Sequence, residues 1–409
     1  MTSLCNRLSS VFLAGLVIVL GAYSHAAAQA LPVCSWPFES TGQGITNVAT
    51  PDTNATYWIM PFDTKSWAAM VIKGQYPKAR FFNFDTYTAT GAAVDSVVDK
   101  DLAPDPGSTN PFATTADSKP QSYTVMISGN ATGSANSVRV GASRLAFVVY
   151  RVYAPNLGLD RTGGVGLPTV SLVAQSGEVR TLRPCPFASA ETGLTNLILL
   201  LRANRFLEAA NFLQQIFLNT DQTNMVFCNP SQPGPGPVAF APATLGANFF
   251  PNPQTTYLET PGICFQQGKV LVVRGKALVF PNSYLTGSVL QPAFDTQIQA
   301  RYWSMCNNDR VIPYPVVACL ADFETVLDEN QFYTYVISGD QAPPSWLPPG
   351  VNWLPWGETD IPKNLIFRII LPVSSALEGA DYTPKAAFCD TAVVMQQGWQ
   401  SCFAPGGVM

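Results

Sequence analysis

The sequence YTVMISG at residues 123–129 is nearly repeated as YTYVISG at residues 333–339. Both copies place aromatic and β-branched residues in a run that ends at glycine, which is typical of a strand followed by a turn. A single match of this kind arises easily by chance. If the residues around the two copies also match, the chain contains a duplicated domain.

Three further matches lie around this pair in the same order along the chain. They are PDTNATY (51–57) with PNPQTTY (251–257), ARFF (79–82) with ARYW (300–303), and RVYAP (151–155) with RIILP (368–372). Each piece has the composition and the Gly, Pro or Asn boundaries of a strand. The ordered set predicts a mainly β protein of two tandem antiparallel β-sandwich domains that arose by internal duplication, at residues 31–185 and 246–409.

The segment between the two copies, residues 186–245, has a different pattern. Residues 189–219 carry apolar side chains at helical spacing, which predicts a helix or a helical hairpin. These side chains are expected to face an apolar surface, most simply the groove between the sandwiches: Leu197, Leu200, Leu201, Phe206, Leu207, Phe212, Ile216 and Phe217. The Pro- and Gly-rich residues 229–242 then predict a stiff connector.

Residues 1–30 have the features of a signal peptide. Arg7 precedes the short apolar run VFLAGLVIVL at residues 11–20, and AQA at residues 28–30 fits a cleavage site. The apolar run is too short for a good membrane span. We therefore expect an exported bacterial protein, located in the periplasm, at the cell surface or outside the cell, with no membrane insertion.

Eight cysteines follow residue 30, an even number in a compartment that permits oxidation. Eight cysteines allow 105 pairings, and their positions suggest one of them. A bridge from Cys34 to Cys185 would tie the ends of the first copy, and one from Cys228 to Cys264 would pin the connector. Two short loops would be closed by the pairs Cys306–Cys319 and Cys389–Cys402.

Missing residues exclude much familiar chemistry. The only histidine, His25, lies in the predicted signal peptide, so the usual general base of serine and cysteine hydrolases is absent after it. Motifs for nucleophile elbows, dinucleotides and phosphate loops are also absent. The formal net charge of −4 and the sparse charged residues suggest no nucleic-acid face. The chain therefore favours a binding or structural role over an enzyme.

Aromatic residues supply the first candidate ligand site. Trp346, Trp353 and Trp356 lie in one proline-rich loop, and Tyr302 and Trp303 lie on a strand of the same copy. Their flat rings suit an apolar, aromatic or saccharide ligand, held near this loop or between the sandwiches. The alternative is that the rings fold back as core.

Arginines at matching positions supply a second candidate. They are Arg80 with Arg301 and Arg151 with Arg368. An arginine present in both copies suits a buried carbonyl or a carboxylate at a strand end. The alternative is that Arg301 and Arg368 clamp an anionic ligand.

An acidic loop at residues 95–110 is a weak candidate for calcium. Its oxygen ligands would be Asp99, Asp101, Asp105 and Asn110, because calcium needs hard oxygens and tolerates irregular spacing. The alternative is that Asp and Pro only shape a long turn. No other cofactor is indicated.

The second copy resembles a known group of proteins. Its segments ARYWS (300–304), YTYVISG (333–339), NWLP (352–355) and FRIILP (367–372) are similar to the C-terminal β-domain of bacterial proteins classed only as domains of unknown function. The group usually has Tyr where this chain has Ile370. The first copy resembles the partner domain at residues 79–87 and 145–155. The resemblance implies two linked β-sandwiches and assigns no catalytic residue.

These observations favour an exported binding or structural protein with a small-molecule or glycan ligand. One alternative is a carboxylate-dependent glycan hydrolase or lyase, since paired acids suffice for that chemistry. The available acids are Asp85, Asp309, Asp322, Glu324 and Asp328. Another alternative is self-association through exposed strand edges into a surface layer or filament.

Overall fold

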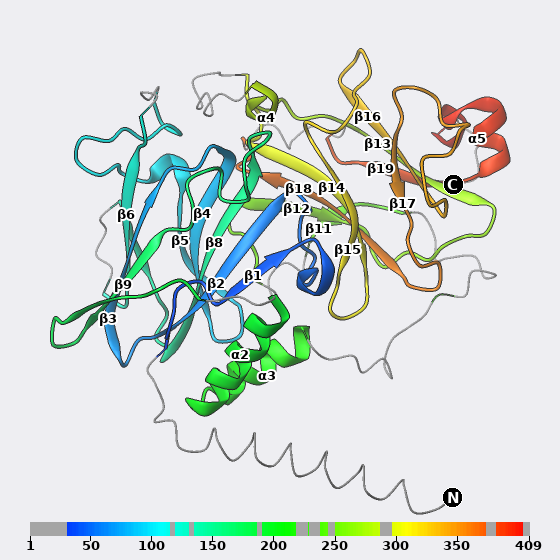
Figure 1. Ribbon diagram of the computed structural model, residues 1–409. Coiled ribbons are helices and arrows are strands. Elements are labelled where there is room, and N and C mark those ends of the chain that lie inside the picture. The colour runs from blue at the N-terminus through cyan, green and yellow to red at the C-terminus, as the bar shows by residue number, and fades with distance from the viewer. Residues whose placement is uncertain are drawn as a thin grey trace, which may run out of the picture.

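The computed structural model describes residues 31–114, 119–130, 135–185, 190–217, 228, 238–243, 250–286, 297–373 and 382–403. The predicted signal peptide and most of the predicted connector lie outside these residues. The described chain forms four sheets in two groups, with helices α2 (Ala190–Ala203) and α3 (Leu207–Phe217) between the groups in sequence. Figure 1 shows the two groups side by side.

The first half contains two five-stranded sheets. Its inner sheet has the order β1-β2-β8-β4-β5, formed by Phe38–Thr41, Ala55–Asp63, Leu145–Pro155, Ala79–Thr88 and Ala93–Val98. Its outer sheet has the order β10-β9-β3-β6-β7, formed by Val179–Thr181, Thr169–Ala174, Trp67–Gln75, Ser122–Ser128 and Ser137–Arg139. The short 3-10 helices η1 (Gly44–Thr46) and η2 (Asp99–Asp101) lie in its loops.

The second half repeats this plan. Its inner sheet has the order β11-β12-β18-β14-β15, formed by Ala241–Pro242, Thr255–Glu259, Lys363–Ile370, Tyr302–Asp309 and Val316–Ala321. Its outer sheet has the order β17-β16-β13-β19, formed by Asn352–Pro355, Phe332–Ser338, Lys269–Lys276 and Lys385–Asp390. The remaining elements are α4 (Ser283–Thr286), α5 (Thr391–Gln397) and η5 (Trp399–Phe403).

The strand orders confirm two β-sandwich-like halves with one topology. Even the parallel pairing of β6 with β7 recurs, between β16 and β17. The repeated sequence phrase forms β6 and β16, where Tyr123 lies opposite Gly74 and Tyr333 opposite Gly275. A Cβ atom at Gly74 would lie 2.6 Å from the Tyr123 hydroxyl oxygen. Each tyrosine ring therefore occupies the space above a glycine.

Each inner sheet is buried on both faces. In β8, Val148, Tyr150 and Val152 face the core of the first sandwich, while the alternating residues Phe147 and Val149 face away from it and are also buried. A nearly continuous apolar run such as LAFVVY is typical of a strand covered on both sides. In Figure 1 the two inner sheets meet in the middle of the molecule.

The helices cover part of the inner sheet of the first half. Leu197, Leu201 and Leu213 pack against Phe38 and Phe147 of that sheet. We expected the helices in the groove between the sandwiches. They lie instead on the first half, and Phe250 is their contact from the second half. Leu207 is 56% exposed, contrary to expectation. The side chains of Ile216 and Phe217 lie outside the described part of the chain.

Four disulfides are present, in the pairs that the cysteine positions suggested: Cys34–Cys185, Cys228–Cys264, Cys306–Cys319 and Cys389–Cys402. The first joins the two ends of the first half, and its loop spans 151 residues. Of the described helices, none has the length and apolar character needed to cross a bilayer.

Candidate functional site

Each half sends a short segment across to the other half. We call these segments arm 1 (residues 49–52) and arm 2 (residues 250–252), and they precede β2 and β12. In arm 1, the Thr50 amide donates to the Tyr314 carbonyl at 2.8 Å. In arm 2, the Phe250 amide donates to the Gly91 carbonyl at 3.2 Å. The arms therefore interlock the halves reciprocally.

A buried arginine from the opposite half holds each arm. Arg151 on β8 donates to the Phe250 carbonyl at 2.6 Å, and Arg368 on β18 donates to the Thr50 carbonyl. Both arginines are 2% exposed. Thr50 and Phe250 also share a left-handed backbone, with φ of 51° and 52°. Hydrogen bonding to a buried carbonyl, one of the two roles suggested for the paired arginines, is therefore seen in both copies.

A second pair of arginines joins the halves by reciprocal ion pairs. Arg80 and Asp322 approach to 2.8 Å, and both side chains are completely buried. The matching contact, between Arg301 and Asp99, is 3.4 Å. Burial raises the pKa of Asp322 to about 6 although the charge of Arg80 opposes the shift, and burial also raises the pKa of Asp99. Arg301 is therefore part of the junction between the halves.

A cavity lies between the two inner sheets where the arms cross. Its volume is about 110 Å³, and it is partly open to solvent. Most of its wall is apolar, contributed by Val48, Pro51, Ile59, Val149, Phe250 and Ile366. Polar residues of both halves also line it, among them Tyr57, Arg151, Tyr153, Asn252, Tyr257 and Arg368, together with the charged residues Glu259, Asp309 and Arg310.

The charge of Arg151 is shared with a neighbouring acid. Arg151 forms an ion pair with Asp85, which is completely buried. Burial lowers the pKa of Arg151, and the acid beside it holds the proton in place. Burial, with the charge of Asp52, raises the pKa of Tyr57, and burial likewise raises that of Tyr153. The phenols of Tyr57 and Tyr153 are therefore neutral.

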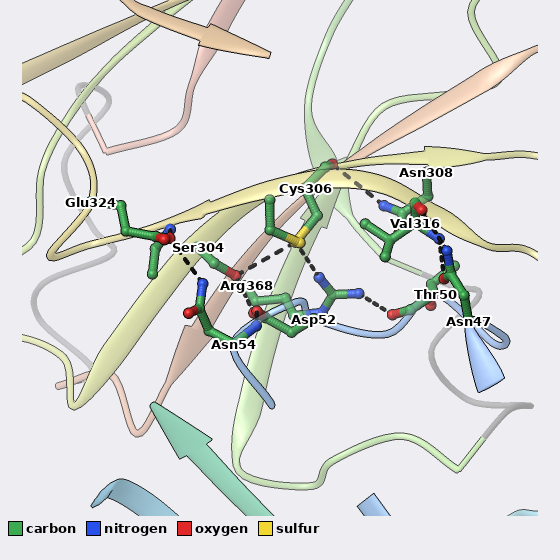
Figure 2. Close-up of a disulfide and its surroundings, with 12 residues drawn as sticks. Asn47, Thr50, Asp52, Asn54, Ser304, Cys306, Asn308, Val316, Glu324 and Arg368 are labelled. Carbon is green, nitrogen blue, oxygen red and sulfur yellow. Dashed lines mark hydrogen bonds between the residues drawn. A yellow bond between two sulfur atoms is a disulfide. The ribbon is translucent and has the colours of Figure 1, made fainter. Parts of the chain in front are cut away.

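The second copy lacks the acid that pairs with this arginine. Cys306 stands at the position of Asp85, because β14 pairs with β18 in the register in which β4 pairs with β8. Arg368 donates to the Cys306 sulfur at 2.8 Å, as Figure 2 shows. Among the residues that the structure describes, Arg368 has no carboxylate within ion-pair distance.

Asp52 lies close to Arg368, but other donors engage its oxygens. Ser304 and Tyr302 donate to one of its oxygens at 2.6 and 3.0 Å, as Figure 2 shows for Ser304. A carboxylate oxygen of Asp52 and the sulfurs of Cys306 and Cys319 lie within 4.8 Å of one another. Both sulfurs belong to a disulfide, so neither is a thiolate that binds metal.

Two buried donors on the cavity wall have no partner. Arg151 Nε and Asn252 Nδ2 are both inaccessible and make no hydrogen bond. The Asn252 oxygen is engaged, because it accepts from the Gln254 amide and from Asn83 at 3.1 Å each. Because both atoms are inaccessible to solvent, these donors lie within the wall and do not face the open space of the cavity.

The predicted aromatic residues lie away from this cavity. Trp303 and Trp356 are core residues of the second sandwich, 0% and 1% exposed. Trp346 packs on the far face of the outer sheet with Trp399 of η5, and Trp353 donates to Ser338 at 2.9 Å. Tyr302 is also buried and donates to Asp52. The structure does not gather these rings around one binding surface.

The predicted calcium ligands do not converge. Asp99 faces Arg301, and Asp101 pairs with Lys100 at 2.8 Å. The Asn110 amide donates to the carbonyls of Asp99 and Leu102 at 2.7 and 2.8 Å. Within the described ranges, the acids of this loop, including Asp105, form no group at metal-ligand spacing. The contacts are those of a structured turn.

The acids considered for glycan cleavage are engaged by cations or by hydrogen-bond donors. Asp85 pairs with Arg151, Asp322 with Arg80, Asp309 with Lys363 and Asp328 with Arg274. Glu324 accepts from Asn54 and from the Ala321 amide, each at 2.8 Å. None of these contacts presents two facing acids to a sugar.

Sequence reasoning missed four of the residues that line the cavity: Tyr57, Phe250, Asn252 and Tyr257. A signal for them was available, since PDTNATY and PNPQTTY match between the copies and contain three of the four. The match predicts a shared structure there, but it does not reveal that the prolines lie in segments that cross to the other half.

Comparisons with known proteins support the fold. No protein-family model and no curated protein matches the chain. An uncharacterized protein from Burkholderia cenocepacia has a similar structure, with a TM-score of 0.52 and 13% identity over 88% of this chain and 84% of that one. A protein from Vibrio parahaemolyticus gives a TM-score of 0.42 and 14% identity over 83% and 89% of the two chains. The likeness to the Burkholderia protein shows the fold alone.

Proposed function

We propose that this chain is a binding protein that holds one small, largely apolar molecule in the cavity between the inner sheets. The observation that carries this proposal is the cavity itself, whose apolar wall surrounds a few convergent polar groups at the junction of two halves. Ligand sites in proteins have this composition and this location. An apolar cavity of about 150 Å³ accepts benzene. The ligand is therefore about the size of one ring or a short carbon chain.

The remaining features support binding rather than catalysis. No histidine follows the predicted signal peptide. The cavity arginine Arg151 and the acid Asp85 neutralise each other, and the phenols of Tyr57 and Tyr153 keep their protons. Such groups bind and orient a ligand.

An exported location also belongs to this proposal. Four disulfides support a compartment more oxidising than the cytoplasm. The signal peptide predicted for residues 1–30 supports the same location.

Filling the cavity tests the proposed function. Val149 lines the cavity and is 1% exposed, so Val149→Phe places a larger side chain in the ligand's space. The control is Val179→Phe on β10, where the residue is 61% exposed. We expect native mass spectrometry of the gently purified protein to show an excess mass that denaturation removes. Val149→Phe should lose this mass, and the control should keep it.

Two results would contradict the proposal. The first is an excess mass that remains unchanged in a folded Val149→Phe variant, because the ligand then lies elsewhere. The second is a bare protein mass for the wild type that small apolar molecules added at millimolar concentration do not change.

A further inference from the structure

A second cavity, which we call the outer cavity, lies on the outer sheet of the second half. Its volume is about 350 Å³, and it opens to solvent. Residues of β13, β16 and β19 form its floor, and residues of η5 form one side. We infer that the outer cavity binds one carboxylate-bearing sugar unit, a hexuronate, of an acidic polysaccharide. This site is separate from the cavity between the inner sheets and does not depend on the function proposed for it.

The segment that forms the side of the outer cavity belongs to the second copy alone among the described residues. In the second half, α5 and η5 follow β19 and pack on the outer face of the sheet, and Figure 1 shows α5 there. In the first half, the matching strand β9 is followed by β10 instead. The disulfide Cys389–Cys402 ties η5 to β19. The wall is therefore a fixed addition to the duplicated fold.

The rings and the amide of this wall suit a sugar. Phe332, Trp399 and Phe403 line the outer cavity, and each is partly exposed. The faces of a sugar ring carry C–H groups, which pack on aromatic rings, while its hydroxyl groups need hydrogen bonds. Gln400 is exposed beside the rings, and its amide can both donate to a hydroxyl group and accept from one. An open cavity also suits one unit of a polymer, because the neighbouring units can extend into solvent.

Arg274 supplies donors in a fixed orientation. Its guanidinium carbon lies 4.7 Å from the centre of the Phe332 ring and 4.4 Å from that of Trp399. The same group donates to Thr334 at 2.8 Å and pairs with Asp328 at 2.7 Å. These two bonds leave other N–H groups of the guanidinium without a partner. Because the side chain is 24% exposed, those N–H groups are open to a ligand oxygen.

The charges around the outer cavity favour one carboxylate. Arg274 and Lys385 are the charged residues that line it. Asp328 offsets the charge of Arg274, whereas Lys385 is exposed and forms no ion pair within the described part of the chain. Outside the wall, Lys276 on β13 and Glu329 in the turn before β16 add one charge of each sign. One positive charge remains, and a hexuronate carries one carboxylate to pair with it.

Exposed residues supply variants that should fold. Lys385→Gln removes the ammonium charge and keeps a polar side chain. Phe403→Leu removes a flat ring and keeps an apolar side chain. Lys73→Gln is the control for charge, because Lys73 is exposed on β3 at the ladder position that matches Arg274, in the half without an equivalent of η5 among its described residues.

Isothermal titration calorimetry at low ionic strength tests the inference. The probes are the trimers of galacturonate, mannuronate and guluronate, each compared with its methyl ester, which keeps the sugar rings and removes the charges. At least one acid trimer should bind about fivefold or more tightly than its ester. Lys385→Gln should weaken that trimer by about fivefold or more, and Phe403→Leu by about threefold or more. Lys73→Gln and Val149→Phe should leave its affinity unchanged.

Equal affinities for each acid trimer and its ester would overturn the inference, because the carboxylate then plays no part. An affinity that Lys385→Gln or Phe403→Leu does not change would also overturn it, as would an equal loss in Lys73→Gln. A lack of binding by all three acid trimers would reject the site. The function proposed for the inner cavity is judged separately, by the excess mass that Val149→Phe should remove.

Discussion

At the scale of single residues, Tyr123 and Tyr333 explain why one phrase occurs twice in the chain. Each ring lies over a glycine on the neighbouring strand, at Gly74 and at Gly275. A side chain at either glycine would meet the ring, since the distance from a Cβ at Gly275 to Tyr333 Cζ would be 2.6 Å. The tyrosine and the glycine therefore form one packing unit that has been kept in both halves.

Substitution of this glycine should destabilise the protein. Gly74→Ala would force the buried ring of Tyr123 to move, and overpacking of this kind costs about 1–3 kcal/mol. Gly129→Ala is the control from the same phrase, because no atom lies within 4 Å of its added Cβ. Urea denaturation should show the loss for Gly74→Ala and a change within about 0.5 kcal/mol for Gly129→Ala. Equal stabilities of the two variants would contradict the packing argument.

Residue types predicted some of the residues at the site, but not the contacts that hold them. Arg151 and Arg368 stood out because both copies keep a charge in an apolar strand, and the structure gives them matching contacts. Their partners are the carbonyls of Thr50 and Phe250, and any residue supplies a carbonyl, so no pattern reveals them. The tryptophans near residue 350 were the most visible aromatic residues, yet composition does not show whether a ring faces solvent or a core.

At the scale of elements, helical periodicity was a sound guide to the helices and a poor guide to what they cover. The alternation within α2 and α3 shows that one face is apolar. Any apolar surface is a suitable partner for that face. The pattern alone therefore could not choose between the groove between the halves and the inner sheet of the first half. Strand order was more predictable, because a duplicated topology is visible as a collinear match of short sequences.

A truncation on the covered face of α2 should test this position. Leu197 is 1% exposed and packs on the inner sheet, so Leu197→Ala should cost about 2–5 kcal/mol in the free energy of unfolding. Leu207→Ala in α3 is the control, since that side chain is 56% exposed and should lose little. Chemical denaturation followed by tryptophan fluorescence would measure both. A small cost at Leu197 would mean that the helices dock only loosely.

At the scale of the whole molecule, the halves are joined by contacts that recur in reciprocal form. Each half contributes an arm, an arginine that holds the opposite arm, and one member of each ion pair between Arg80 and Asp322 and between Arg301 and Asp99. Sequence matching predicted two halves, but not this interlock. It depends on backbone segments that are adjacent only after both halves have folded.

The buried ion pair should make stability depend on pH. The pKa of Asp322 is about 6 in the folded protein and about 3.9 in an unfolded chain. Between these values the folded state holds the proton and the unfolded state does not, so the free energy of unfolding falls as pH rises. The loss is on the order of 3 kcal/mol and is complete above pH 6.

Asp322→Asn removes this titration and leaves the other groups in place. The free energy of unfolding of the wild type minus that of the variant should therefore shrink by roughly this amount between pH 4 and pH 7. Urea denaturation at both pH values would measure it. Parallel pH profiles for the two proteins would show that Asp322 keeps its ordinary pKa in the folded state.

The interlocked arms have a consequence for how a ligand is oriented. In a dimer of identical chains, a cavity on the two-fold axis presents every residue twice, so an asymmetric ligand has two equivalent poses. Here both halves belong to one chain, and their matching positions have diverged: Asp85 corresponds to Cys306, and Asp52 corresponds to Asn252. Because the two halves differ, the two orientations of a ligand in the cavity are not equivalent. The cavity can therefore distinguish the head of a ligand from its tail.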